Sequence, residues 1–69
     1  MNIMDQEEIL RSELAVLREE HRALDTEIAA MGDDPFTERL ALVRLKKRKL
    51  ALKDRIARIE DQLYPDIIA

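Results

Sequence analysis

Two seams rich in leucine and isoleucine, separated by one break, constrain the fold of this chain more than any other feature. The first seam contains Leu10, Leu14, Leu17, His21, Leu24, Ile28 and Met31. The second seam contains Leu42, Leu45, Lys49, Leu52, Ile56, Ile59 and Leu63. Both alternate steps of three and four residues, which is the a/d period of a coiled coil. The pattern therefore predicts two amphipathic helices.

Residues with known cap preferences indicate where the first helix begins and ends. Asp5, followed three residues later by Glu8, forms a capping-box pattern. The first helix is therefore expected over about residues 5–31. Gly32 is expected to close it with a left-handed C-terminal cap, which begins a turn over about residues 32–35.

The second helix is expected over about residues 36–64. Asp34 is the predicted N-cap, with Pro35 at the first helical position, where the missing N–H costs nothing. Thr37 is a rival N-cap. Pro65 ends the helix, because the residue before a proline disfavours the helical region.

A turn this short forces neighbouring helices to run antiparallel. The expected fold is all-α: an antiparallel, coiled-coil-like two-helix hairpin that forms a single domain over residues 1–69, with a short tail at 65–69. Two paired helices bury only one stripe each, and the chain has no cysteine to cross-link them. We therefore expect the hairpin to associate with itself into a helical bundle.

The charges beside the seams favour the antiparallel arrangement. Residues 1–34 carry three basic and ten acidic side chains, whereas residues 35–69 carry nine basic and five acidic ones. A fold about residue 34 or 35 predicts four pairs of opposite charge: Glu20 with Arg48, Glu13 with Arg55, Asp25 with Lys46, and Arg11 with Glu60. One pair, Arg18 with Lys53, has like charge. Such pairs exclude wrong registers more than they stabilise the fold.

His21 and Lys49 interrupt the two seams with polar side chains. Each lies fourteen residues from Pro35, so a hairpin brings them to the same level within about one helical turn. We interpret them as a polar layer that sets the register, as polar a-position residues do in coiled coils. The functional alternative is a pH-sensitive or ligand-contacting layer.

The segment from Arg44 to Lys49 is the one basic run in the sequence. Lys46, Lys47 and Lys53 could line one outer face of the second helix and hold the phosphates of a nucleic acid. The interpretation that we favour is a solvated face that also supplies partners for the first helix. Weak nucleic-acid binding stays the alternative function.

The sequence gives no basis for catalysis, a cofactor or a metal site. One histidine, no cysteine and three hydroxyl side chains (Ser12, Thr26 and Thr37) leave no nucleophilic triad. The N-terminus lacks the basic and apolar regions of a signal peptide, and no stretch approaches the ~18 apolar residues of a membrane span. We expect a cytoplasmic protein that is not an enzyme and has no membrane partner.

Several apolar residues lie beside or behind the two seams: Ile3, Met4, Ile9 and Val16 in the first helix, and Leu40, Val43 and Leu50 in the second. One interpretation is a wider stripe that the hairpin itself covers. The interpretation that we favour is a second surface for another copy of the chain or for an unidentified protein partner, because so thin a scaffold cannot cover them all.

Two blocks of sequence have a distinctive polar pattern. They run from Leu17 to Ile28, which includes Glu20-His21-Arg22, and from Leu45 to Ile56, which includes Leu45-Lys46-Lys47. Together they resemble the YdcH-like family, small bacterial proteins classed as a domain of unknown function. The resemblance covers roughly residues 10–62. It implies a two-helix hairpin in a bacterial cytoplasm, and it implies no activity, substrate or cofactor.

Overall fold

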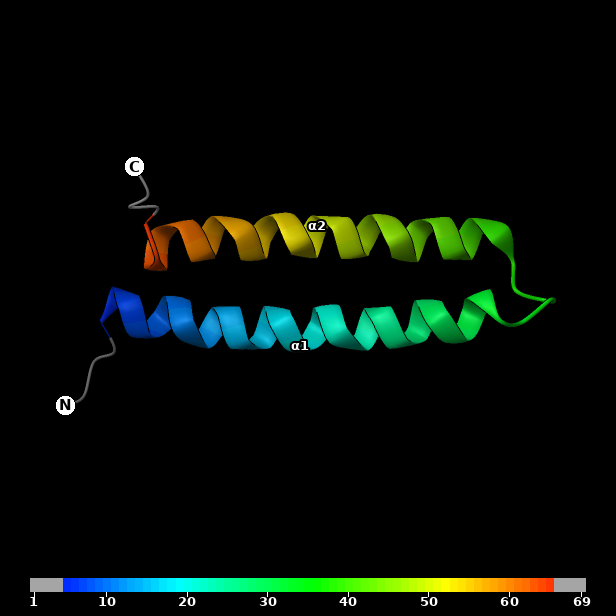
Figure 1. Cartoon of the computed structure of the whole chain (residues 1–69), viewed down its shortest axis with the longest axis horizontal. Helices are drawn as coiled ribbons and strands as arrows, with labels where there is room; N and C mark the ends of the chain where they lie inside the picture. The colour runs from blue at the N-terminus through cyan, green and yellow to red at the C-terminus, as the bar shows by residue number, and fades with distance from the viewer. Residues whose placement is uncertain (1–4, 66–69) are drawn as a thin grey trace.

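The chain folds into two antiparallel α-helices, as a computed structural model of residues 5–65 shows (Figure 1). α1 spans Gln6–Gly32 and α2 spans Arg39–Leu63. No strand occurs within residues 5–65. These elements confirm the predicted all-α hairpin. Ile3, Met4 and tail residues 66–69, on which part of the prediction fell, lie outside the described range.

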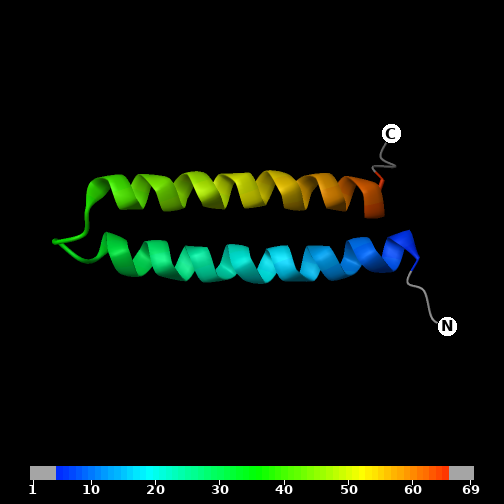
Figure 2. The ribbon, with the colours of Figure 1, turned by 180° about the vertical axis from the view of Figure 1, so that it is seen from behind.

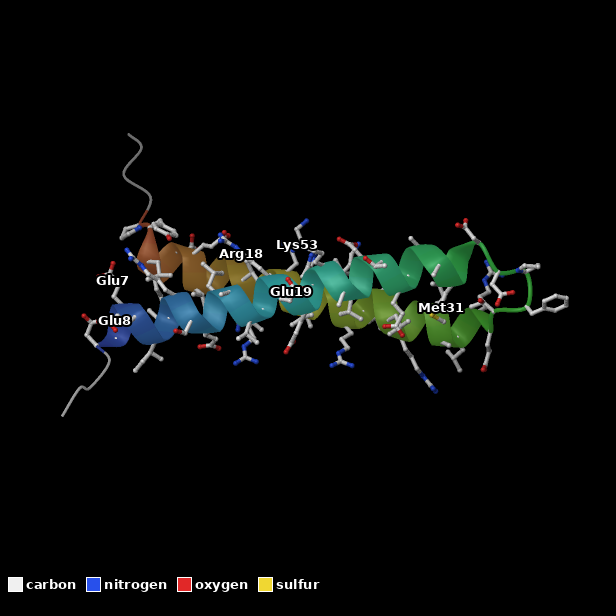
Figure 3. The ribbon with its side chains drawn as sticks, turned by 90° about the horizontal axis from the view of Figure 1, so that it is seen from below. Glu7, Glu8, Arg18, Glu19, Met31 and Lys53 are labelled. Atoms are coloured by element: carbon white, nitrogen blue, oxygen red, sulfur yellow. The ribbon has the colours of Figure 1, made fainter. Side chains whose placement is uncertain are left out.

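The two helices lie side by side over nearly their whole length. Seen from behind, the start of α1 and the end of α2 lie at one end of the hairpin, and the connection lies at the other (Figure 2). Seen from below, the helices cross at a shallow angle (Figure 3). This arrangement brings the seam of each helix against the seam of the other.

The core is a single line of seam residues. Those that are buried are Leu14, Leu17 and Leu24 from α1, and Leu52 and Ile59 from α2. Leu10, Leu45, Ile56 and Leu63 are partly buried and pack against them. All nine occupy seam positions, because only the a/d face of each helix meets the other helix. The remaining faces of both helices are in contact with solvent.

The N-terminus of α1 is capped by a side chain. The carboxylate of Asp5 accepts a hydrogen bond from the backbone N–H of Glu8 at 2.8 Å, so the predicted N-cap is confirmed. Glu7 and Glu8 also place negative charge in the first turn, where it complements the helix dipole. Figure 3 shows both side chains at this end of the hairpin.

The predicted left-handed cap at Gly32 is wrong. Gly32 is the last residue of α1, and no residue in the described range has a positive φ angle. The C-cap is Asp33, whose φ of −84° and ψ of −11° keep the right-handed conformation. Its N–H still donates to the carbonyl of Ala29 at 3.3 Å, so the helical hydrogen bonding extends one residue past the glycine.

The predicted start of α2 at Asp34 and Pro35 is also wrong. The carboxylate of Asp34 accepts from the N–H of Phe36 at 2.9 Å, and its carbonyl accepts from the N–H of Thr37 at 3.2 Å. Asp34 therefore stabilises a turn around Pro35 instead of capping a helix.

The N-cap of α2 is Glu38, which makes no side-chain hydrogen bond to the helix. This position rules out Thr37, the rival N-cap, as well. α2 begins at Arg39, three residues later than expected, because residues 34–37 are held in the turn.

Candidate functional site

The two polar residues that interrupt the seams meet at one carboxylate. Lys49 of α2 donates a hydrogen bond from Nζ to Oδ1 of Asp25 in α1 at 2.6 Å. His21 lies one turn before Asp25, with its Nδ1 3.6 Å from Oδ2. The structure thus brings His21 and Lys49 to the same level of the hairpin, and their role in setting the register stays a prediction.

The partner predicted for Asp25 is wrong. We expected Lys46, which lies in the corresponding flanking column of α2. Instead the long side chain of Lys49 leaves the seam and carries its ammonium group outward to the carboxylate. The half-buried position of the lysine fits this path, since 33% of its side chain is exposed, against 51% for the Asp25 side chain.

The ammonium group of Lys49 lowers the pKa of Asp25. The hydrogen bond from Lys49 is the largest cause, and partial desolvation opposes it. Charge–charge interactions with Lys49 and with His21 add a smaller lowering. Asp25 is therefore ionised at neutral pH. Its carboxylate lies beside His21, one turn earlier in α1, and binds Lys49 of α2.

Two further ion pairs join the helices. Arg55 donates to Glu13 at 2.9 Å, which confirms one predicted pair. Arg18 donates to Glu60 at 2.7 Å. Arg11, the partner predicted for Glu60, instead binds Glu7 on its own helix at 2.6 Å. That prediction is wrong because an arginine side chain can reach acceptors on more than one turn.

The repulsion expected between the like charges of Arg18 and Lys53 is reduced because Arg18 binds Glu60. Both side chains lie on the same side of the hairpin (Figure 3). The last predicted pair, Glu20 and Arg48, lines one shallow groove of about 200 Å³. The described structure shows no ion pair between these two residues.

The candidate phosphate-binding lysines are accessible. Lys46, Lys47 and Lys53 are exposed on α2, and none of the three forms an ion pair with another residue of the described range. Lys46 and Lys53 are seven residues apart and so share one helix face. The outer face of α2 therefore carries free positive charge.

Each helix also carries an exposed apolar stripe outside the seam. Residues seven apart fall on one line along a helix. We define the α1 stripe as Ile9, Val16 and Ala23, and the α2 stripe as Val43, Leu50, Ala57 and Tyr64. The exposed fractions of Ile9 and Val16 are 51% and 57%, and those of Val43, Leu50 and Tyr64 are 42%, 59% and 57%.

Only part of these stripes was predicted from the sequence. The large aliphatic members were predicted, whereas Ala23, Ala57 and Tyr64, which are also exposed, were not. The available indication was the spacing of seven residues that joins Ala23 to Val16, Ala57 to Leu50 and Tyr64 to Ala57. Leu40 is likewise exposed, at 51%, and lies one turn before Val43.

A second hollow lies at the open end of the hairpin. It has a volume of about 580 Å³ and is lined by Gln6, Glu7, Leu10, Gln62, Leu63 and Pro65. It contains one titratable side chain, Glu7, which already binds Arg11. No group of three or more potential metal ligands occurs within residues 5–65. Neither α1 nor α2 is long and apolar enough to cross a bilayer.

Comparison with known proteins identifies a family. The model of a family described as "Protein of unknown function (DUF465)" matches residues 14–60. The match covers more than half of the chain and includes most of both seams, from Leu14 to Ile59, so the chain belongs to this family. It confirms the resemblance to YdcH-like proteins. No curated protein and no solved structure matches the chain.

Proposed function

We propose that this member of the DUF465 family is a non-enzymatic interaction module. It associates with helices of other protein chains, and first of all with copies of itself, through the apolar side chains on its outer surface. The observation that carries the proposal is the α2 stripe, in which Leu50 is 59% exposed and Val43 42% exposed. As part of the proposal, the module works in the cytoplasm, the compartment implied by the resemblance to bacterial YdcH-like proteins.

The energetics of a small hairpin support association. A single core in a chain of this size rarely supplies more than about 3–5 kcal/mol of stability. Burying further apolar area contributes about 25 cal/mol per Å². The exposed aliphatic side chains of both stripes can gain this contribution only when another molecule covers them. Association would therefore stabilise the hairpin as well as bring partners together.

The experiment that tests this function is the mass of the untagged protein by size-exclusion light scattering, with refractive-index and ultraviolet detection. The chain has one tyrosine and no tryptophan, so bound nucleic acid would dominate the ultraviolet signal. We expect a multiple of the 8.1 kDa chain mass without excess absorbance. A monomer at every concentration would contradict the proposal.

The second candidate function is weak nucleic-acid binding by α2. The exposed Lys46, Lys47 and Lys53, which are free of ion pairs within the described range, are the observation that favours it. Phosphate contacts of this kind weaken steeply as salt rises. This function predicts a salt-dependent mobility shift with DNA or RNA that the triple Lys→Glu variant loses. The triple Lys→Arg variant should retain the shift as a matched control.

A further inference from the structure

We propose that the α1 stripe of one copy docks on the α2 stripe of a second copy, so that the chain assembles head to tail. This inference rests on the proposed function and specifies its surface and its first partner. The observations behind it are the charges beside the two stripes and the faces of the hairpin on which the stripes lie.

The charges beside the α1 stripe are negative. Glu13, Glu20 and Glu27 form the neighbouring column on the seam side, and Glu19 lies on the outer side. Glu20 and Glu27 make no ion pair with any residue of the described hairpin. Glu13 and Glu19 are paired within the hairpin, with Arg55 and Arg22 respectively, so the uncompensated carboxylates beside the apolar line of α1 are Glu20 and Glu27.

The positive charges beside the α2 stripe are concentrated around Val43 and Leu50. The neighbouring column on the seam side holds Lys46, Lys53 and Glu60, and the column on the outer side holds Lys47, Asp54 and Asp61. Contact between an α1 stripe and an α2 stripe brings these lysines to carboxylates. A parallel contact between two α2 stripes would bring lysines together, and a contact between two α1 stripes would bring glutamates together in either direction. An antiparallel contact between two α2 stripes would set lysines against Asp54 and Asp61, while Glu60 is already bound to Arg18. The mixed contact sets the lysines against the unpaired Glu20 and Glu27, so electrostatic complementarity favours it.

The ion pairs show that the two stripes lie on opposite faces of the hairpin. Ile9 and Val16 are within one turn of Glu13, which binds Arg55 along one face. Ala57 and Tyr64 are within one turn of Glu60, which binds Arg18 along the opposite face.

A two-fold dimer presents the same patch from both copies. It could therefore not bury an α1 stripe and an α2 stripe of each copy at once. The mixed contact is heterologous, and each docked copy leaves one stripe open for the next.

The spacing of the two stripes fits this contact. Ile9, Val16 and Ala23 repeat every seven residues, as do Val43, Leu50 and Ala57. Each apolar side chain of one stripe can therefore meet one of the other along the helix. A single pair of helix faces buries less than a standard interface of about 1,600 Å², so the assembly should be weak and should grow with protein concentration.

Two matched double variants test the proposal. The first, Ile9→Gln with Val16→Gln, removes the α1 stripe, and the second, Val43→Gln with Leu50→Gln, removes the α2 stripe. All four positions are exposed, from 42% to 59%, and glutamine suits a helix, so both variants should fold. Circular dichroism checks that they do.

Light scattering of the separate and mixed variants gives the result. We expect each variant alone to be monomeric at concentrations where the wild type assembles. An equimolar mixture should form a complex of twice the 8.1 kDa chain mass and no larger, because one intact contact remains. A dimer of either variant alone, or a mixture that stays monomeric, would overturn the proposal.

The same measurements separate this inference from the function on which it rests. If the wild type assembles but the mixture does not, the head-to-tail contact is wrong and self-association stands. If the wild type stays monomeric at every concentration, both are wrong.

Discussion

Lys49 of α2 and Asp25 of α1 are joined across the hairpin by a hydrogen bond of 2.6 Å. Lys49 interrupts the apolar seam of its own helix, and His21, which interrupts the other seam, approaches the same carboxylate. The two polar residues that interrupt the seams thus share one carboxylate at the same level of the hairpin. A shifted register would separate Lys49 from Asp25, so this contact can favour one alignment of the helices.

The stability of the hairpin should depend on the ionisation of Asp25. Its pKa in the folded chain is lowered by Lys49, whereas an aspartate in an unfolded chain has a pKa of about 3.9. A lowered folded pKa contributes stability that is present above the unfolded pKa and is lost as pH falls through the folded pKa. The free energy of unfolding, measured with urea at a series of pH values, should therefore decrease over this acidic range.

The variant Asp25→Asn isolates that contribution. It should be less stable than the wild type at neutral pH and should lose less stability on acidification. Asp61→Asn, which removes an exposed carboxylate without an ion pair in the described range, should retain the wild-type dependence. An Asp25→Asn profile that ran parallel to the wild type would show that the contact with Lys49 adds no stability.

Truncation of a core leucine should unfold the chain. Leu17 is only 5% exposed, and removing a buried leucine side chain costs about 2–5 kcal/mol. This is comparable to the whole stability of a small hairpin, about 3–5 kcal/mol. We expect Leu17→Ala to lose most of its helical circular dichroism at room temperature.

The matched control is Leu50→Ala in dilute protein, where association does not contribute. Because the Leu50 side chain is 59% exposed, its truncation should change the stability by no more than about 0.5 kcal/mol. Equal effects of the two substitutions would mean that the seams do not form the core.

Gly32→Ala should stabilise the protein. Gly32 lies at the end of α1 without a positive φ angle, and an added Cβ would meet nothing within 4 Å. Alanine restricts the unfolded chain and favours the helix, by about 0.4–1 kcal/mol. Thermal unfolding should show a higher midpoint. A clear decrease would indicate that the glycine adopts the left-handed cap that its sequence position favours.

A better N-cap should stabilise α2. Glu38 occupies the N-cap without a side-chain hydrogen bond, whereas the shorter Asp5 bonds the backbone of its helix. Glu38→Asp should therefore gain up to about 1 kcal/mol, and Asp5→Ala should lose about the same amount. Urea denaturation of the two variants compares the caps directly, and a loss of stability in Glu38→Asp would contradict this account.

The parts of the fold that could be predicted from sequence are those fixed by periodicity. The heptad pattern placed Leu14, Leu17 and Leu24 in the core and Glu13 opposite Arg55, because both follow from helix geometry. The cap at Gly32 and the turn at Asp34 could not be predicted in the same way. Alternative local hydrogen bonds with similar energies compete there, so a helix can end one or two residues earlier or later.

The partners of long side chains were equally hard to predict. Lys49 reaches Asp25 from the seam, and Arg18 reaches Glu60 instead of opposing Lys53, since each side chain spans about one helical turn. The exposed stripes were found only in part, because Ala23 and Ala57 add little hydrophobicity and are visible only through their spacing.

The central claim is that the exposed apolar surface of this hairpin is an interface. The most direct test is to measure the thermal unfolding midpoint at a series of protein concentrations. Association that occurs only in the folded state raises the midpoint as concentration rises. We predict such a rise for the wild type and none for the variant in which Ile9, Val16, Val43 and Leu50 are all replaced by glutamine. A wild-type midpoint that is the same at every concentration would contradict the claim.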